Sequence, residues 1–275
     1  MSAVSGNTIT LLTDFGTVDY FAAALKGVLL SAAPGVSLID ITHEIPAHDI
    51  HAGAFTLGAC WHTFPAGTIH LAVVDPGVGS ERRVIVVRAD GHYFVGPDNG
   101  LFSFVYARAS DIRVWRVTRT DLFRQPVSAT FHGRDVFAPL AARLARGMPP
   151  EQTGAPVLNY QRFEMTAPSL DTAGNLCGEI IHIDRFGNCV TSLTTADLAP
   201  EHTGPWTRLV AGDCVVRNFV THYAAAPGAE LMAYPGSAGY WEIALWQDAA
   251  AARFHLARGA VVSVQHGPIR HGPGV

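Results

Sequence analysis

Four short motifs combine charged side chains with glycine, and each is placed where an apolar run ends. They are Thr13-Asp14-Phe15-Gly16, Asp75-Pro76-Gly77-Val78-Gly79-Ser80-Glu81-Arg82, Phe131-His132-Gly133-Arg134-Asp135 and Asp184-Arg185-Phe186-Gly187-Asn188. The first closes the apolar run 9–12 and the second closes the run 69–74. An open α/β sheet binds its ligand at the carboxyl ends of its strands. The four motifs together therefore predict an active site that is assembled from loops.

Asp14 follows a short apolar strand and precedes Gly16, and two roles fit this position. An aspartate there can cap the next helix. Its carboxylate can instead accept hydrogen bonds from a pair of vicinal hydroxyls, such as those of a ribose. Position alone leaves both roles open.

The motif that begins at Asp75 is more specific. Pro76 restricts the backbone of Asp75, and Gly77 and Gly79 allow a sharp turn and a close approach to a ligand. Arg82 follows within reach, so we expect an Asp75–Arg82 ion pair, which could serve a site or simply hold the loop. The motif lacks the Gly-Lys-Ser/Thr ending of a phosphate-binding loop.

Two other motifs carry candidate groups for proton transfer and for nucleoside binding. His132 lies before a predicted helix, where it could handle a proton or be purely structural. Asp184, Phe186 and Asn188 offer a carboxylate, an aromatic face and an amide within five residues, which suits a nucleoside. A β-hairpin connection is the alternative for this segment, since Gly187 would serve either role.

The thirteen histidines do not form a recognisable metal motif. His43-Glu44 begins like HExxH, but Ala47 stands where the second histidine is required. His48 and His51 are not accompanied by a nearby carboxylate motif that would complete a ligand set. We therefore expect no metal.

Composition limits the function classes. The chain has 275 residues, 48% apolar and 15% charged, with a net charge of −4. These values indicate a compact globular protein. The basic residues form no cluster, so nucleic-acid binding is not expected.

The start of the chain does not resemble a signal peptide. The uncharged stretch 52–74 contains Pro65 and Gly67, which argues against a membrane span. The four cysteines have no CxxC spacing and are interpreted as small buried hydrophobes. We expect a soluble, cytoplasmic protein.

Strand and helix patterns alternate in the first half of the chain. Strands are predicted at 9–12, 36–41 and 69–74, and helices at 20–32, 51–61 and 136–146. The Asp90-Gly91 dipeptide between the runs 83–89 and 92–95 is typical of a hairpin turn. This alternation predicts an α/β N-terminal domain with a mainly parallel sheet.

The second half carries only short β-type runs, after a stretch that prolines 149, 150, 156 and 168 interrupt. The runs are 177–183, 190–193, 208–210, 214–216, 230–234, 240–244 and 260–264. This pattern predicts a smaller all-β, barrel-like C-terminal domain. We expect an α/β domain over residues 1–165, a linker over 166–175 and the β-barrel domain over 176–275.

The four motifs, in this order and spacing, resemble those of the S-adenosylmethionine (SAM) hydroxide adenosyltransferase family. This is the SAM hydrolase branch of a superfamily that also contains fluorinase and chlorinase enzymes. The resemblance covers essentially the whole chain, from the segment 11–16 to the segment 237–244. The combination of DPGVGSxR, FHGRD and DxFGN is far more specific than any single motif.

The resemblance implies a fold, an assembly and a reaction. The fold is an N-terminal α/β domain with a C-terminal β-barrel, and the assembly is a homotrimer with active sites between neighbouring subunits. The reaction is attack of water or hydroxide on the ribose C5′ of SAM, which gives adenosine and L-methionine with no metal and no cofactor. The implied catalytic set is Asp75, Arg82 and His132, and the implied ribose ligand is Asp14. Contacts to adenine and methionine fall on Asp184, Phe186, Asn188 and Ser237, with Tyr223 as a weaker candidate for stacking on adenine.

This chemistry is consistent with the residues. A sulfonium group leaves as a neutral thioether, so the difficult step is to obtain a competent nucleophile from water. Arg82 can stabilise a developing hydroxide, while His132 or Asp75 orients the water or accepts its proton. Sequence does not decide between His132 and Asp75. Two positions depart from the family pattern, because Ala238 replaces a usual serine and Trp246 replaces a usual asparagine.

Three alternatives stay open. The chain could be a halide-dependent SAM halogenase, although such relatives generally lack the full Asp–Arg–His set. It could bind SAM or adenosine without turnover, which would need Asp14, Phe186 and Asn188 only. It could also be a metal-dependent hydrolase that uses Asp14, Asp75 and His132.

Overall fold

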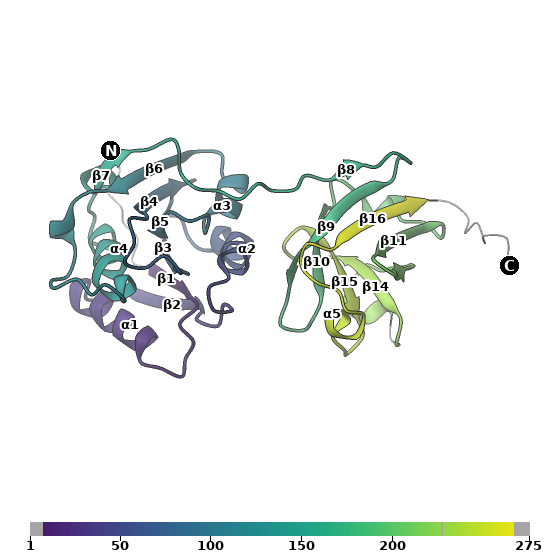
Figure 1. The fold of residues 1–275 in the computed structure, drawn as a ribbon, viewed down its shortest axis with the longest axis horizontal. Helices are drawn as coiled ribbons and strands as arrows, with labels where there is room; N and C mark the ends of the chain where they lie inside the picture. Colours follow the sequence, from purple (N-terminus) through teal and green to yellow (C-terminus); the bar gives the residue numbers. More distant parts are fainter. Residues whose placement is uncertain (1–7, 227, 267–275) are drawn as a thin grey trace. The chain divides into compact units, whose positions relative to one another are not determined.

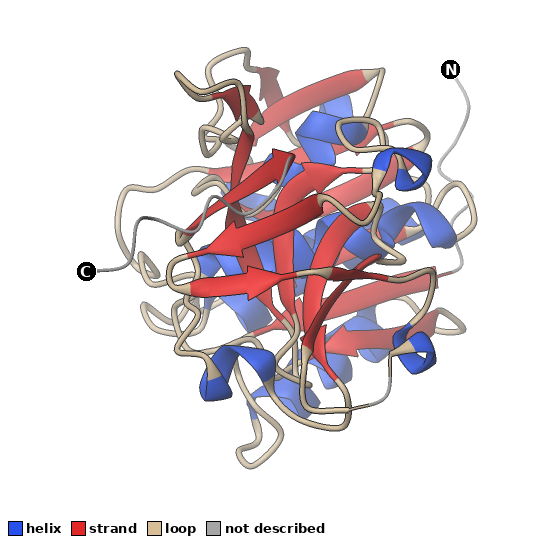
Figure 2. Cartoon of the chain, turned by 90° about the vertical axis from the view of Figure 1, so that its right-hand side faces the viewer, coloured by secondary structure: helices blue, strands red, loops and turns tan. Residues whose placement is uncertain are grey.

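The computed structural model describes residues 8–226 and 228–266, and the chain forms two compact units, residues 1–163 and 164–275 (Figure 1). The first unit combines strands with helices, whereas the second consists mainly of strands with one short helix. Figure 2 distinguishes helices, strands and loops by colour.

The first unit contains a seven-stranded sheet in the order β2-β1-β3-β5-β4-β6-β7. Its strands are β1 (Thr8–Thr13), β2 (Ser37–Thr42), β3 (Ile69–Val73), β4 (Val84–Ala89), β5 (His92–Pro97), β6 (Ile112–Val117) and β7 (Gly154–Pro156). Five strands run in one direction, while β4 and β7 run in the opposite one. The predicted α/β class with a mainly parallel sheet is confirmed.

Helices cover both faces of this sheet. They are α1 (Phe21–Ala32), α2 (Ile50–Cys60), α3 (Ser103–Arg108) and α4 (Ala138–Ala145), with a π-helical turn η3 (Gly133–Phe137) before α4. Short 3-10 turns lie at Trp61–Thr63, Thr120–Leu122 and Pro150–Gln152. Within the described ranges 8–226 and 228–266, no helix has the length and apolarity needed to cross a membrane.

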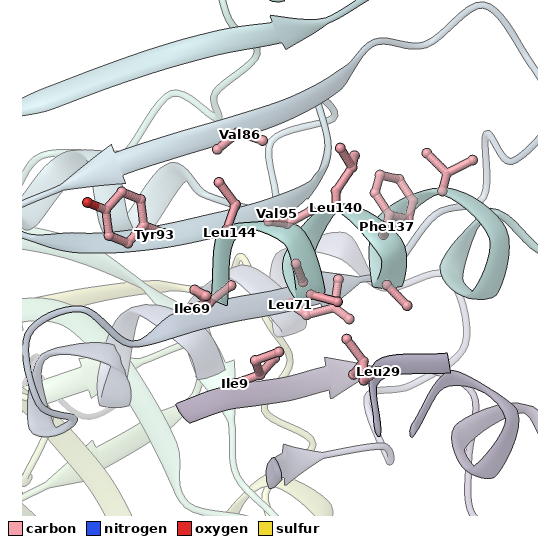
Figure 3. Packing of buried hydrophobic residues seen from close by; sticks show 14 of the residues in the cluster. Ile9, Leu29, Ile69, Leu71, Val86, Tyr93, Val95, Phe137, Leu140 and Leu144 are labelled. Carbon is pink, nitrogen blue, oxygen red and sulfur yellow. The ribbon is translucent and has the colours of Figure 1, made fainter. Parts of the chain in front are cut away.

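Each central strand contributes side chains to two cores. In β1, Ile9 and Leu11 belong to a cluster with α1 and α4, whereas Leu12 belongs to a cluster with α2 and α3. Figure 3 shows Leu140 and Leu144 of the α4 segment gathered with Ile69 and Leu71 of β3. Strands that are buried on both faces need continuous apolar runs, which is why these strands could be predicted from sequence.

The structure adds elements that the sequence patterns did not predict. Strand β6 lies between β4 and β7, and its exposed Arg113 and Arg116 interrupt the apolar run that marks the other strands. The sequence predicts no strand in the proline-interrupted stretch after Met148, yet β7 pairs with β6 at the edge of the sheet. The predicted hairpin turn is confirmed, because Asp90 and Gly91 both have positive φ, at 45° and 85°. Such a pair of left-handed residues is what a two-residue hairpin turn requires.

The second unit contains one sheet in the order β12-β11-β16-β9-β10-β15-β14-β13, with β8 also paired to β9. Its elements are β8 (Ser169–Leu170), β9 (Leu176–Ile183), β10 (Cys189–Thr194), β11 (Thr207–Ala211), β12 (Cys214–Val216), β13 (Asn218–Phe219), β14 (Leu231–Pro235), β15 (Tyr240–Leu245), β16 (Val261–His266), the helix α5 (Ala250–Arg253) and 3-10 turns at Pro200–His202 and Tyr223–Ala225. The outermost strands β12 and β13 are separated in the chain by Arg217 alone. The sheet must therefore curl back on itself, which confirms the predicted barrel-like all-β fold.

A chain of buried polar groups crosses the sheet of the first unit. Thr10 Oγ1 lies 2.8 Å from His70 Nδ1, and His70 Nε2 lies 3.2 Å from His92 Nδ1. His70 is fully buried, and burial together with the neighbouring His92 lowers its pKa to about 3. His70 is therefore neutral in the folded protein over the usual pH range.

Acid is expected to destabilise the fold through His70. An unfolded histidine has a pKa near 6.5, so the unfolded state binds more protons between about pH 6.5 and pH 3. The free energy of unfolding should thus fall by about 1.4 kcal/mol per pH unit in that window. Above pH 7 the ring is neutral in both states, so His70 should cause no pH dependence there. Urea denaturation from pH 8 to pH 4 measures this. His70→Gln is the control: it should flatten the acid slope, and an unchanged slope would contradict the assignment to His70.

Candidate active site

A cavity of about 280 Å³ opens in the first unit, beside the carboxyl ends of β1 and β3. Its lining comes from four segments, residues 14–21, 47–48, 73–78 and 130–133. Asp14 directly follows β1 and Asp75 follows β3, and these two strands are parallel neighbours in the sheet. Strand pairing thus brings the two aspartates to one edge, as expected for an open α/β sheet.

Asp75 and Arg82 form the predicted ion pair. Arg82 Nε donates to both carboxylate oxygens at 2.9 Å, and Nη2 donates to Oδ2 at 2.5 Å. The Arg82 and Asp75 side chains are only 10% and 5% exposed, respectively. In such a sheltered position a forked guanidinium–carboxylate contact fixes the orientation of both groups.

The loop that joins these two residues is folded tightly. The amide of Val78 donates to the Asp75 carbonyl, and the hydroxyl of Ser80 donates to the Gly77 carbonyl. Gly79 has a φ of 80°, and a Cβ at this position would lie 2.6 Å from the carbonyl oxygen of Ala129. Only glycine therefore allows this loop to approach the segment that leads to His132.

Arg82 also contacts His132. Its Nη2 lies 2.9 Å from His132 Nδ1. A guanidinium carries only donors, so Nδ1 must accept this hydrogen bond, and the neutral ring carries its hydrogen on Nε2. Burial and the charge of Arg82 lower the pKa of His132, while Asp75 and Asp135 oppose the shift. His132 is therefore a neutral Nε2–H donor at pH 7.

Asp14 lies on the wall of the same cavity. Its Oδ2 accepts a hydrogen bond of 2.9 Å from the backbone amide of His48, whose φ is 68°. Helix α1 begins only at Phe21, with Tyr20 at its N-cap. Asp14 does not cap that helix, so the capping alternative is wrong. Its second carboxylate oxygen has no hydrogen-bond partner among the residues that the structure describes.

In the second unit, the segment 184–188 forms the turn between β9 and β10. Asp184 accepts hydrogen bonds from the amides of Phe186 and Asn188, at 2.9 and 2.8 Å, and from Asn188 Nδ2 at 3.0 Å. Phe186 is 76% exposed. Asn188 is buried, and its Oδ1 has no hydrogen-bond partner within the described part of the chain. The hairpin interpretation is correct for the backbone. The turn exposes the aromatic face of Phe186, while the unsatisfied amide oxygen of Asn188 is buried.

Tyr223 and Ser237 differ in their surroundings. The Tyr223 hydroxyl donates to the Leu245 carbonyl at 2.8 Å and accepts from the Gln247 amide at 2.6 Å. The Tyr223 ring stacks on Trp246, with the centroids 5.1 Å apart. One face of the tyrosine is thus covered by the tryptophan that departs from the family pattern. Ser237 is exposed in the turn between β14 and β15.

Comparison with known proteins identifies the family. The model of the SAM hydroxide adenosyltransferase N-terminal domain matches residues 9–154, and that of the C-terminal domain matches residues 178–263. This chain belongs to the SAM hydroxide adenosyltransferase family. The resemblance inferred from the motifs is thereby confirmed.

The curated relatives include proteins named SAM hydrolase and proteins named fluorinase. A protein of Thermus thermophilus named (R)-S-adenosyl-L-methionine hydrolase is 36% identical over 92% of this chain and 98% of its own length. A protein of Salinispora tropica with the same name is 40% identical over 70% of this chain and 74% of its own length. A protein of Nocardia brasiliensis named fluorinase is 27% identical over 94% of this chain and 95% of its own length.

Solved structures of similar fold include a conserved uncharacterised protein of Thermotoga maritima, with a TM-score of 0.85 and 31% identity. That match covers 93% of this chain and 99% of the other one. A conserved hypothetical protein of Thermus thermophilus has a TM-score of 0.77 and 32% identity, and the match covers 94% of this chain and 99% of that one.

Two further residues, His48 and Glu242, contact the candidate site residues. His48 lines the cavity and holds Asp14 through its backbone amide. Glu242 interacts with Asp184: burial, and then the charge of Asp184, raise the pKa of Glu242. Its Oε2 accepts a hydrogen bond of 2.9 Å from the Tyr234 hydroxyl. Neither residue lies in a glycine-punctuated motif, so no pattern in the sequence distinguished them.

No metal centre is formed by side chains in residues 8–226 and 228–266, since no three His, Cys, Asp or Glu residues are arranged to hold an ion. His43, the first residue of the incomplete HExxH pattern, instead bonds to Thr13 and Asp40.

Asp135 is the fully buried anchor of the segment that carries His132. It accepts hydrogen bonds from Arg134 at 2.8 and 2.7 Å, from Arg124 at 3.0 Å and from the Ser128 amide at 2.9 Å. Hydrogen bonds from Arg134 lower the pKa of Asp135 to about 2, although burial opposes the shift. The carboxylate thus ties the loop 124–130 to the turn that begins at Gly133.

Asp135→Asn is expected to destabilise the protein by about 2–3 kcal/mol, because hydrogen bonds to a charged group are lost inside the fold. The free energy of unfolding in urea at pH 7 measures this. Asp121→Asn is the matched control, because Asp121 pairs with Arg119 on the surface. Solvent screens an exposed pair of this kind, so its loss should affect stability far less. Equal losses in the two variants would contradict the anchoring role of Asp135.

Proposed function

We propose that this family member hydrolyses SAM to adenosine and L-methionine by attack of water on the ribose C5′. The observation that carries the proposal is the hydrogen-bonded chain from Asp75 through Arg82 to His132, at a cavity that Asp14 also lines. Similarity over nearly the whole chain to a relative named as a SAM hydrolase supports the same reaction.

Asp14 is proposed to bind the ribose. Asp14 lines the cavity, and its second carboxylate oxygen, for which residues 8–226 and 228–266 provide no hydrogen-bond partner, is suited to accept hydrogen bonds from the ribose hydroxyls. Such contacts would hold C5′ next to Asp75 and His132. In-line placement of water, C5′ and sulfur can lower the barrier by roughly 7–11 kcal/mol.

The reaction forms one bond and breaks one bond. The water oxygen bonds to C5′ as the C5′–S⁺ bond breaks, and the electron pair of that bond returns to sulfur, which leaves as the neutral thioether of methionine. The water loses one proton and becomes the 5′-hydroxyl of adenosine. Since the leaving group is neutral, no general acid is required for its departure.

We propose that Asp75 accepts the proton and that His132 stabilises the nucleophile. The lone pair of His132 Nδ1 is already engaged by Arg82, so the ring offers only its Nε2–H to the cavity. Asp75 retains free lone pairs beside its bonds from Arg82 and also lines the cavity. A water that donates to Asp75 and accepts from His132 becomes hydroxide-like without losing either contact.

Asp184, Phe186, Asn188 and Ser237 are proposed to bind the adenine and methionine parts, with Tyr223 as an additional contact. The open face of Phe186 and the unsatisfied Oδ1 of Asn188 support this role. The stacking of Tyr223 on Trp246 limits Tyr223 to contacts by its other face or its edge.

We propose a homotrimer with active sites between neighbouring subunits. Exposed apolar side chains next to the cavity support an interface there. Val18 is 98% exposed and Tyr20 is 64% exposed. Light scattering tests the assembly. Refolding a mixture of unfolded Asp75→Asn and Asn188→Ala chains tests whether each active site contains residues of two subunits. Mixed trimers should regain activity only if it does.

The enzyme is further proposed to need no metal or cofactor and to act in the cytoplasm. The four cysteines are free, which suits a reducing compartment. Activity that persists after EDTA treatment would support the first part, whereas a loss that one divalent ion restores would contradict it.

The decisive experiment is incubation of the protein with SAM in oxygen-18 water that contains chloride, followed by mass spectrometry. We expect adenosine labelled at its 5′-hydroxyl, together with methionine. A 5′-chlorinated nucleoside would instead identify a halogenase. Binding of SAM without turnover would identify a binding protein and overturn the proposed reaction.

A further inference from the structure

His43 is a buried histidine that the proposed mechanism does not use. It directly follows β2, and only 3% of its side chain is exposed. Strand β2 pairs in parallel with β1, with Thr42 opposite Leu12, so His43 lies beside Thr13, the residue before Asp14. Its place next to the ribose-binding candidate requires an explanation.

Hydrogen bonds from His43 hold the backbone on both sides of Asp14. His43 Nδ1 lies 2.7 Å from Thr13 Oγ1, and the same hydroxyl oxygen accepts from the Phe15 amide at 3.2 Å. The Gly16 amide donates to the His43 carbonyl at 2.7 Å. The segment that carries Asp14 is therefore tied, directly or through Thr13, to His43.

The orientation of the His43 ring is set from the other side by Asp40. His43 Nε2 lies 3.2 Å from Asp40 Oδ1, and Lys26 Nζ donates to Asp40 Oδ2 at 2.6 Å. A carboxylate paired with lysine can only accept, so Nε2 donates, and in the neutral ring Nδ1 is left to accept from the Thr13 hydroxyl. Asp40 thus accepts hydrogen bonds both from His43 and from Lys26, the only lysine in the chain.

We propose that His43 is a positioning residue for substrate binding, which holds the Asp14 carboxylate toward the ribose through Thr13 and is itself oriented by Asp40 and Lys26. This inference rests on the proposed function, because it deepens the role given to Asp14. A supporting group of this kind keeps a binding side chain in its productive geometry without touching the ligand. Such groups commonly contribute about 10- to 100-fold, as is known for outer-shell partners of metal ligands.

The proposal separates binding from chemistry. His43→Leu should raise KM for SAM and Kd for adenosine by about 10-fold, while kcat changes by less than about 3-fold. His43→Asn should restore part of the affinity, since its amide oxygen can take the place of Nδ1 as acceptor. Thr13→Val, which removes the hydroxyl alone, should reproduce the effect of His43→Leu and serves if the latter does not fold.

A double-mutant cycle with Asp14 distinguishes positioning from general support of the fold. In an Asp14→Ala background, His43→Leu should weaken adenosine binding by less than about 2-fold, because the group it positions is gone. Effects that multiply would overturn the proposal. So would a loss of kcat without a change in KM.

His70 provides the matched control. It is also a buried histidine that bonds to a threonine of β1, but that threonine is Thr10, which lies outside the segment 13–16. His70→Gln should lower stability and leave KM unchanged. If the wild-type protein binds adenosine but does not turn over SAM, only the proposed reaction is overturned. If the wild-type protein turns over SAM and His43→Leu has the same KM and Kd, only the positioning role is overturned.

Discussion

Replacing Asp75 by Asn is expected to lower kcat for SAM hydrolysis by on the order of 10³-fold, with little change in KM. The amide has nearly the same size as the carboxylate but cannot accept the proton of the attacking water. It also loses the forked contact with Arg82, whose Nε and Nη2 both donate to Asp75. Steady-state kinetics with SAM, followed by chromatography of adenosine, measures both parameters.

Asp98 offers a matched control for this variant. It is a buried aspartate that pairs with Arg83 at 2.5 Å, and it does not line the cavity. Asp98→Asn should lower the free energy of unfolding while kcat stays close to that of the wild type. If both variants lost turnover to the same degree, the loss would reflect the fold, and Asp75 would not be the proton acceptor.

Replacing Arg82 by Met is expected to lower kcat by on the order of 10²- to 10³-fold, because a preorganised charge beside the developing hydroxide is removed. The pH dependence should change as well. Burial and then Arg82 lower the pKa of His132, whereas Asp75 and Asp135 raise it. Without Arg82 the pKa of His132 should rise, because the positive charge that opposes protonation of the ring is removed. The NMR titration of the His132 ring should therefore move to higher pH in Arg82→Met.

Arg82→Lys separates charge from geometry in the same experiment. Lysine keeps the positive charge but cannot bond to Asp75 and His132 with one planar fork. We expect the His132 titration to stay closer to its wild-type position while kcat remains low. A wild-type rate in Arg82→Lys would contradict the role of the fork in orienting His132. A His132 titration that does not move in Arg82→Met would contradict the electrostatic coupling.

Much of the first unit could be predicted because its central strands are buried on both faces. Burial on two sides requires unbroken apolar runs, and runs such as 9–12 and 69–74 are visible in the sequence. Strand β6 could not be predicted in this way, because its exposed Arg113 and Arg116 interrupt the apolar run. The helix α3 has only six residues, which is too short for a helical period to stand out.

Among the candidate site residues, some could be placed together from the sequence and others could not. Asp14 and Asp75 could be brought together from the sequence, because each follows a strand of the parallel sheet. The bond between Arg82 and His132 could not be predicted from spacing, since 50 residues separate them and their contact depends on how loop 75–82 packs against the segment near Ala129. The stacking of Tyr223 on Trp246 likewise required the fold of the second unit.

The sequence by itself determined the fold class, the family and the loops that carry the chemistry, because these depend on local patterns: apolar runs, glycine turns and short motifs. The tertiary structure alone decided the hydrogen-bonding state of the groups. It set the donor face of His132 through Arg82 and tied Asp14 to His43 through Thr13. The direction of a hydrogen bond and the tautomer of a histidine ring depend on contacts between residues far apart in the chain. No local sequence pattern encodes such contacts.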